Sequence, residues 1–327
     1  APAMDWLQIL SNTGSSILSP ATLAYALAAL GLAVHFGYAG LLNMGIAGFM
    51  AIGAYGYAIS ILTFGFPWWG GVLVGLVGAV IFALILGIPT LRLRGDYLAI
   101  VTIAAAEVLR LLFLTTAFDD VTGSADGLSG YHSSFRESNP IPQGTYGFGP
   151  WEYNETQWWV RIMGLITLAI LLVWSLMRSP WGRVIKGIRE DEDAVRALGK
   201  NVFSYKMQAL IIGGVIAAAG GIVYALPSAI SPGVYVTSLT FFVWTALLLG
   251  GAATVFGPVI GAVIFWVIQT LLSNVLPAMV QAGVLPFMSS IQAQTLRFVL
   301  VGVALMLIVI FRPQGILGNK KELTFVK

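Results

Sequence analysis

The chain has 327 residues, of which 58% are apolar and only 9% are charged. Soluble domains average about 45–50% apolar and about 25% charged residues, so this composition excludes an ordinary soluble enzyme. The absence of cysteine excludes disulfides, thiolate catalysis and cysteine-ligated metals. The net charge of +3 is no indication of nucleic-acid binding, because the basic residues are confined to a few segments.

Charge is distributed very unevenly along the chain. No Asp, Glu, Lys or Arg occurs in the 86 residues between Asp5 and Arg92, or in the 90 residues between Lys206 and Arg297. A transmembrane helix needs roughly 20 mostly apolar residues, so each stretch is long enough for about three spans. The two stretches are similar in length and both rich in glycine, which suggests an internal repeat.

The apolar runs predict an all-α polytopic membrane protein, with residues 1–327 forming a single transmembrane domain of about nine helices. Strict two-residue alternation is absent, which disfavours a β-barrel. The predicted spans are residues 17–36, 40–64, 67–90, 97–117, 158–178, 207–227, 236–253, 257–276 and 296–311.

Thirteen of the 17 basic residues gather in three segments between or after these spans. Loops rich in Lys and Arg remain in the cytoplasm, so the three segments and the C-terminus are predicted to be cytoplasmic and the N-terminus to lie outside. The basic segments hold Arg92 and Arg94; Arg178, Arg183, Lys186, Arg189, Arg196, Lys200 and Lys206; and Arg312, Lys320, Lys321 and Lys327.

Residues 118–157 are predicted to form an extracytoplasmic loop. The segment carries six acidic residues and one basic residue, Arg136, and it is too long for a plain connector. Its composition fits an ordered surface lid and a docking surface for an external partner equally well.

A glycine-rich motif lies at the start of the second predicted span. It contains Asn43 and five glycines, among them Gly40, Gly45 and Gly48. Small residues allow helices to pack closely, and glycine also permits a break in a helix. The motif is therefore either a packing seam or a discontinuous helix that lines a translocation pathway. Candidate pathway residues are Asn43, Gly45, Gly48, Thr102, Glu107 and Thr245.

Glu107 and Arg110 lie three residues apart inside the fourth predicted span. They share a helix face, so the sequence predicts an ion pair that lowers the cost of placing charges within the membrane. Either a structural role or direct contact with a substrate fits this pair.

The segment 179–206 is predicted to be a cytoplasmic loop that contains a short amphipathic helix. Apolar residues such as Val184, Ile188 and Val195 recur at three- and four-residue spacing among mixed charges. The helix is either a solvated surface element or one that fits a groove in a cytoplasmic partner.

Several functions are disfavoured by what the sequence lacks. It has no phosphate-binding loop of the G-x-x-x-x-G-K-[ST] type and no Ser-His-Asp set, so ATP binding by that loop and membrane-embedded catalysis are not expected. Its two histidines, His35 and His132, lie far apart, and no metal site is predicted. No filter-like segment or ring of charges indicates an ion channel.

The sequence resembles the permease subunits of bacterial ABC importers for branched-chain amino acids, the LivM type. The resemblance extends from about Gly37 to Gly315. It rests on motifs in the family's order, namely GYAG…NMGIAGFMAIGAY, RGDYLAIVTIAAAEVLRL, TGSADGL, SPWGRVIKGIREDEDAVRALGKNVFSYK, the GG…GP turn and FRPQGI.

The resemblance implies a multi-pass protein of the bacterial inner membrane that catalyses no reaction itself. Its partners would be a homologous second permease subunit, two cytoplasmic ATPase subunits that bind ATP and Mg²⁺, and an extracytoplasmic substrate-binding protein. The 179–200 helix would be the coupling helix, with Arg189, Glu190, Asp191 and Glu192 nearest the ATPase.

Two alternatives remain for the function. The first is the permease of a related importer for urea or short-chain amides. The second is a stand-alone secondary transporter, which needs ion-coupling residues inside the spans. Glu107 is the one candidate for such a residue, and Arg110 is expected to neutralise it.

Overall fold

The computed structural model describes residues 5–93, 95–176 and 180–319. The predicted basic residues Arg94, Arg178, Lys320, Lys321 and Lys327 lie outside these ranges. The long helices are α2 (Pro20–Leu32, continued by the π-helix η2, Ala33–Tyr38), α3 (Ile46–Phe64), α4 (Trp68–Thr90), α5 (Gly95–Leu114), α8 (Glu155–Leu176), α11 (Val202–Ala225), α12 (Thr237–Gly250), α13 (Gly257–Gln281) and α14 (Ser290–Phe311).

Shorter elements connect these helices. They are α1 (Trp6–Ser15), η1 (Ser16–Leu18), η3 (Thr116–Phe118), α6 (Asp119–Thr122), η4 (Ser124–Asp126), α7 (Ser133–Glu137), β1 (Thr145–Tyr146), η5 (Gly149–Trp151), β2 (Tyr153–Asn154), α9 (Pro180–Glu190), α10 (Glu192–Ala197) and η6 (Pro232–Val234). β1 and β2 pair antiparallel, with Thr145 opposite Asn154, and the rest of the regular structure in the described ranges is helical.

The prediction of a polytopic helical membrane protein is confirmed. In the described part of the chain, eight helices are long and apolar enough to cross a membrane. The seventh predicted span corresponds to α12, which has only 14 residues and is therefore about 21 Å long, against a hydrocarbon core of about 30 Å. It ends at Gly250, where the predicted Gly-Gly turn begins.

Polar capping residues explain why several helices begin earlier than the apolar pattern indicates. The Asn201 side chain accepts a hydrogen bond from Ser204 N (3.3 Å), so α11 begins at Val202 and not at residue 207. Ser289 and Gln292 form a capping box that starts α14 at Ser290 and not at residue 296. The helix α1, capped by Asp5, was not predicted.

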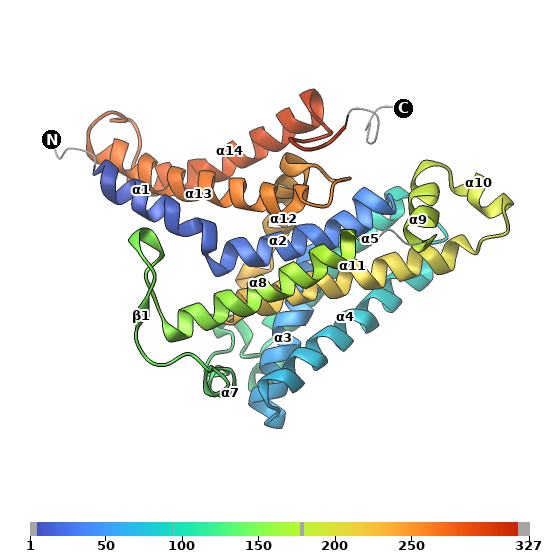
Figure 1. Cartoon of the computed structure of the whole chain (residues 1–327), viewed down its shortest axis with the longest axis horizontal. Coiled ribbons are helices and arrows are strands. Elements are labelled where there is room, and N and C mark those ends of the chain that lie inside the picture. The colour runs from blue at the N-terminus through green and yellow to red at the C-terminus, as the bar shows by residue number, and fades with distance from the viewer. Residues whose placement is uncertain (1–4, 94, 177–179, 320–327) are drawn as a thin grey trace.

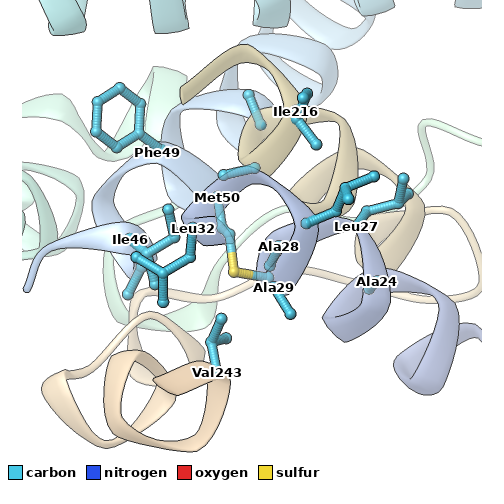
Figure 2. Packing of buried hydrophobic residues seen from close by; sticks show 14 of the residues in the cluster. Ala24, Leu27, Ala28, Ala29, Leu32, Ile46, Phe49, Met50, Ile216 and Val243 are labelled. Atoms are coloured by element: carbon cyan, nitrogen blue, oxygen red, sulfur yellow. The ribbon is translucent and has the colours of Figure 1, made fainter. Parts of the chain in front are cut away.

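The core of the bundle is made by α2, α3 and α11. Figure 2 shows Leu27 and Leu32 of α2 packed with Met50 of α3, Ile216 of α11 and Val243 of α12. The span that includes α2 is 83% buried, whereas those of α5 and α14 are 11% and 6% buried. The outer helices therefore present apolar faces that lipid or another subunit must cover.

The polar segments lie at opposite ends of the bundle. α9 and α10 lie at one end, and α7 and the β1–β2 hairpin lie at the other (Figure 1). We call these the basic end and the loop end. The loop is fastened to the bundle, because Tyr131 donates to Ala225 O (2.7 Å) and Trp151 Nε1 to Gly14 O (3.0 Å). These hydrogen bonds hold the loop against the bundle, and both a lid and a docking surface stay predictions.

Candidate functional site

The first two spans are joined by non-helical backbone that lies inside the bundle. α2 continues as a π-helix to Tyr38, and α3 begins only at Ile46. Gly40 has φ of +70°, a conformation that suits glycine. We call residues 39–45 the re-entrant segment. The second span is therefore helical only from Ile46, and not from residue 40. Gly40 and Gly45 lie at a break between helices, whereas the later glycines of the motif lie within α3 and pack closely on other helices.

Side chains from two other helices bind the backbone of the re-entrant segment and of the start of α3. Buried backbone that is not helical must find hydrogen-bond partners elsewhere in the protein. Met44 N donates to Thr102 Oγ1 of α5 (3.0 Å), and Ala47 N donates to Thr240 Oγ1 of α12 (3.2 Å). The indole of Trp244, also on α12, donates to Asn43 O (3.0 Å). α5 and α12 thus position the start of α3.

Asn43 is the centre of the re-entrant segment. Its side chain is fully buried. Its Oδ1 accepts a hydrogen bond from Gly45 N (2.8 Å), and its Nδ2 lies 3.1 Å from His35 Nδ1. Both ends of the amide are therefore bound inside the protein, so Asn43 holds the break in shape. Contact with cargo stays a prediction for this residue.

His35 connects the re-entrant segment to α11. Its Nε2 lies 2.9 Å from Leu210 O, a carbonyl that can only accept, so Nε2 carries the proton and donates. Nδ1 then accepts from the amide of Asn43, and the ring is neutral. The sequence analysis considered His35 only to exclude a metal site. It did not predict that the buried ring would connect the re-entrant segment to α11.

The structure brings four of the six candidate pathway residues together. The other two, Glu107 and Thr245, do not take part in this contact. Asn43, Gly45, Gly48 and Thr102 form the contact between the start of α3 and α5. Thr245 is buried on α12 and donates to Phe241 O within its own helix. Thr240 and Trp244 were missed, because nothing in a continuous apolar run distinguishes the residues that face a helix break.

Gly45 is expected to tolerate no side chain. A Cβ there would lie 2.1 Å from Thr102 O, a backbone atom that cannot move alone. We expect Gly45→Ala to lower stability by about 1–3 kcal/mol through overpacking. Gly302→Ala in α14, where a Cβ meets nothing within 4 Å, is the matched control and should be neutral or slightly stabilising. Thermal unfolding in detergent measures both, and equal melting temperatures would contradict the expectation.

Glu107 and Arg110 form the predicted ion pair. Arg110 Nε donates to both carboxylate oxygens at 3.1 Å, and Arg110 Nη2 also binds Oε1. Their side chains are 40% and 22% exposed in the single chain. The pair is therefore partly exposed on α5 in the single chain.

The predicted amphipathic segment at the basic end consists of two short helices and not one. α9 ends at Glu190, and Asp191 adopts an extended conformation that interrupts the helix. Its carboxylate caps α10 by accepting from Ala194 N (3.1 Å). Ile185 and Ile188 of α9 are buried against the chain, as the apolar spacing predicted.

Arg189 fastens this segment to the end of the first span. Its Nη1 donates to Gly37 O (2.6 Å), in the π-helical turn just before the re-entrant segment. Its side chain is 11% exposed and also binds Glu190. A helix C-terminus has unpaired carbonyls and a partial negative charge, both of which a guanidinium satisfies.

Glu192 makes a second connection on the same side. It binds Lys206 at the start of α11 (2.6 Å), and Lys206 Nζ also lies 3.4 Å from Leu91 O. These residues line a cavity of about 250 Å³ between the segment, the re-entrant backbone and the α4–α5 turn. All four predicted coupling residues thus have partners within the chain, but Arg189 and Glu192 are half-buried, while Glu190 and Asp191 are exposed.

Comparison with known proteins agrees with this architecture. Residues 17–310 match the family described as branched-chain amino acid transport system / permease component. The high-affinity branched-chain amino acid transport system permease protein LivM of Salmonella typhimurium is 30% identical over 96% of this chain and 72% of its own length. A probable branched-chain amino acid transport permease protein LivM of Methanocaldococcus jannaschii is 26% identical over 92% of both chains.

Relatives with another substrate also match. The nucleoside ABC transporter permease protein NupC of Lactococcus lactis subsp. cremoris is 26% identical over 71% of this chain and 73% of its own length. The helical bundle, the ordered motifs and the extent of the match lead to one conclusion. This chain is a multi-pass membrane permease that belongs to the family of branched-chain amino acid transport system permease components.

Proposed function

We propose that this chain is the permease subunit of an ATP-driven importer for branched-chain or other neutral amino acids. The observation that carries the proposal is the extent of the matches. LivM relatives from Salmonella and Methanocaldococcus align with at least 92% of the chain, whereas the nucleoside permease NupC aligns with 71%. Nucleoside import is the second candidate, since that relative also matches.

The proposed partners are a homologous second permease, two cytoplasmic ATPase subunits that bind ATP and Mg²⁺, and an extracytoplasmic substrate-binding protein. The Glu107–Arg110 pair supports the second permease. A partly exposed charged pair on a membrane helix must face protein or water, since lipid solvates it poorly. The part of α5 that carries the pair would then adjoin the second subunit or the pathway between the two subunits.

ATP binding and hydrolysis in the partners would act on α9 and α10. Glu190 and Asp191 are the exposed acids that an ATPase groove would bind, and Arg189 carries the displacement to Gly37. The end of the first span, the re-entrant segment and α3 would then move together. In this mechanism the chain itself catalyses no bond change.

Reconstitution tests the proposed function. The chain is assembled with its second permease, ATPase and binding protein in vesicles, and uptake of radiolabelled L-leucine, guanosine and urea is measured with and without ATP. We expect ATP-dependent leucine uptake. Uptake of guanosine or urea in its place would assign a different substrate, and gradient-driven uptake by the chain alone would indicate a secondary transporter.

Charge reversal tests the coupling role. Glu190→Lys or Asp191→Lys should weaken ATPase association about tenfold, equivalent to about 1.4 kcal/mol, because an acid that contacts the partner becomes a base. The control is Glu152→Lys, an exposed acid at the loop end. Co-purification of the ATPase with each variant measures the effect, and unchanged association in all three would contradict the role.

A further inference from the structure

A cavity of about 610 Å³ lies at the loop end, away from the re-entrant segment. It is open to the surface and is lined by the start of α2, the start of α8, the end of α11 and the residues after it, and Arg136 of α7. Cavities of about 300–1,000 Å³ are typical of small-molecule sites. The volume is therefore sufficient for a ligand the size of an amino acid.

Arg161 of α8 lines this cavity and is only 7% exposed. Its Nη1 donates to Gln157 O (3.1 Å), and its guanidinium stacks 3.6 Å above the ring of Tyr153. Its Nε is buried without a hydrogen-bond acceptor. Within the described ranges, no carboxylate lies within 4.0 Å of it.

Three other buried or half-buried cations have an acidic partner, whereas Arg161 and the half-buried Arg297 of α14 have none among the described residues. Of these two, Arg161 is the more buried and is the one that lines this cavity. Arg110 has Glu107, Arg189 has Glu190, and Lys206 has Glu192. Burying a cation without a counter-charge costs several kcal/mol, so a chain retains one when the charge is used. The unpaired Arg161 therefore indicates an anion that is supplied from outside the chain.

The mouth of the cavity is also positive. Arg136 is exposed there and forms no ion pair with any described residue. Nearby, burial and the charge of Arg136 lower the pKa of His132 below its usual value. The acid at the start of α8, Glu155, binds Gly144 N (3.3 Å) and neither arginine.

We propose that this cavity binds the carboxylate of a small molecule, held by the guanidinium of Arg161 with Arg136 at the mouth. Guanidinium groups are planar and bind carboxylates through charge-assisted hydrogen bonds, which are stronger than hydrogen bonds between neutral groups. This inference rests on the proposed function for the identity of the ligand, which would be a neutral amino acid bound by its α-carboxylate. Nucleosides and urea lack a carboxylate and would not use the site.

The test compares 3-methylbutanoate with 3-methylbutanamide, which have the same shape and differ by one charge. Binding of each radiolabelled probe, and of L-leucine, is measured on the assembled transporter in lipid nanodiscs without the binding protein. We expect the wild type to prefer the acid over the amide at least about tenfold, since hydrogen bonds to charged groups contribute about 1.5–3 kcal/mol. Equal binding of acid and amide would overturn the proposal.

Variants connect the preference to Arg161. Arg161→Gln should remove it, Arg161→Lys should retain part of it, and the control Arg297→Gln, in a different span, should leave it unchanged. If Arg161→Gln does not fold, the acid and amide binding of the wild type and of Arg161→Lys still tests the proposal. If Arg161→Gln leaves small-molecule binding intact but releases the external binding protein, the anion is an acidic side chain of that protein and the proposal is wrong.

The carboxylate site and the proposed function of amino acid import can be contradicted independently of each other. An assembly that prefers the acid but transports no leucine would retain the carboxylate site and overturn amino acid import. An assembly that transports leucine but binds the acid and the amide equally would support amino acid import and overturn the carboxylate site.

Discussion

Replacing Arg189 with methionine should uncouple ATP hydrolysis from transport. Arg189 is the described side chain that joins α9 to the carbonyl of Gly37, and its removal leaves that carbonyl without this donor. We expect leucine uptake by the reconstituted assembly to fall at least about tenfold, equivalent to about 1.4 kcal/mol of lost coupling. ATP hydrolysis should fall much less, because Glu190 and Asp191, the proposed contacts with the ATPase, are unchanged.

Arg196→Met is the matched control for this effect. Arg196 lies in α10 and binds Glu192 and Asp193, but its side chain is 58% exposed. Surface ion pairs contribute about 0–1 kcal/mol, so uptake should change less than twofold. Arg189→Lys should give an intermediate result, since lysine keeps the charge without the planar guanidinium. Equal uptake in the Arg189→Met and Arg196→Met variants would contradict the connection.

Replacing Asn43 with leucine should destabilise the bundle strongly. The substitution leaves Gly45 N without its acceptor and His35 Nδ1 without its donor in a fully buried place. Each unsatisfied buried group costs about 1–3 kcal/mol, so we expect a loss of about 2–6 kcal/mol. Uptake should fall with stability, because the start of α3 is no longer held.

Asn274→Leu provides the comparison for Asn43. Asn274 is an amide on α13 that donates to Thr270 O of its own helix and accepts from Asn12, and it is only partly buried. Its loss should cost about 1 kcal/mol. Thermal unfolding followed by tryptophan fluorescence measures both variants. A melting temperature for Asn43→Leu as high as that of Asn274→Leu would show that Asn43 is not essential to the break.

Short sequence patterns correctly predicted those features of the helices that depend only on neighbouring residues. Gly250 and Gly251 ended α12 at the predicted turn, and the apolar spacing of Ile185 and Ile188 correctly identified the face of α9 that packs on the chain. The beginning of α3 was misjudged, because an apolar run of the right length does not reveal that its first residues are non-helical. The extended Asp191 within the charged segment was likewise missed, although a capping aspartate is a known start signal.

The sequence by itself determined that this chain is embedded in a membrane, where its apolar helices lie and which family it resembles. Composition, charge gaps and motif order are properties of neighbouring residues, and they do not depend on how the helices pack. The tertiary structure decided which polar groups find partners. Hydrogen bonds join Arg189 to Gly37 and Trp244 to Asn43, which are far apart in the chain, and no carboxylate of the described residues lies within 4.0 Å of Arg161. In a low-dielectric interior each such pairing changes the free energy by one or more kcal/mol, so these contacts determine how the chain works.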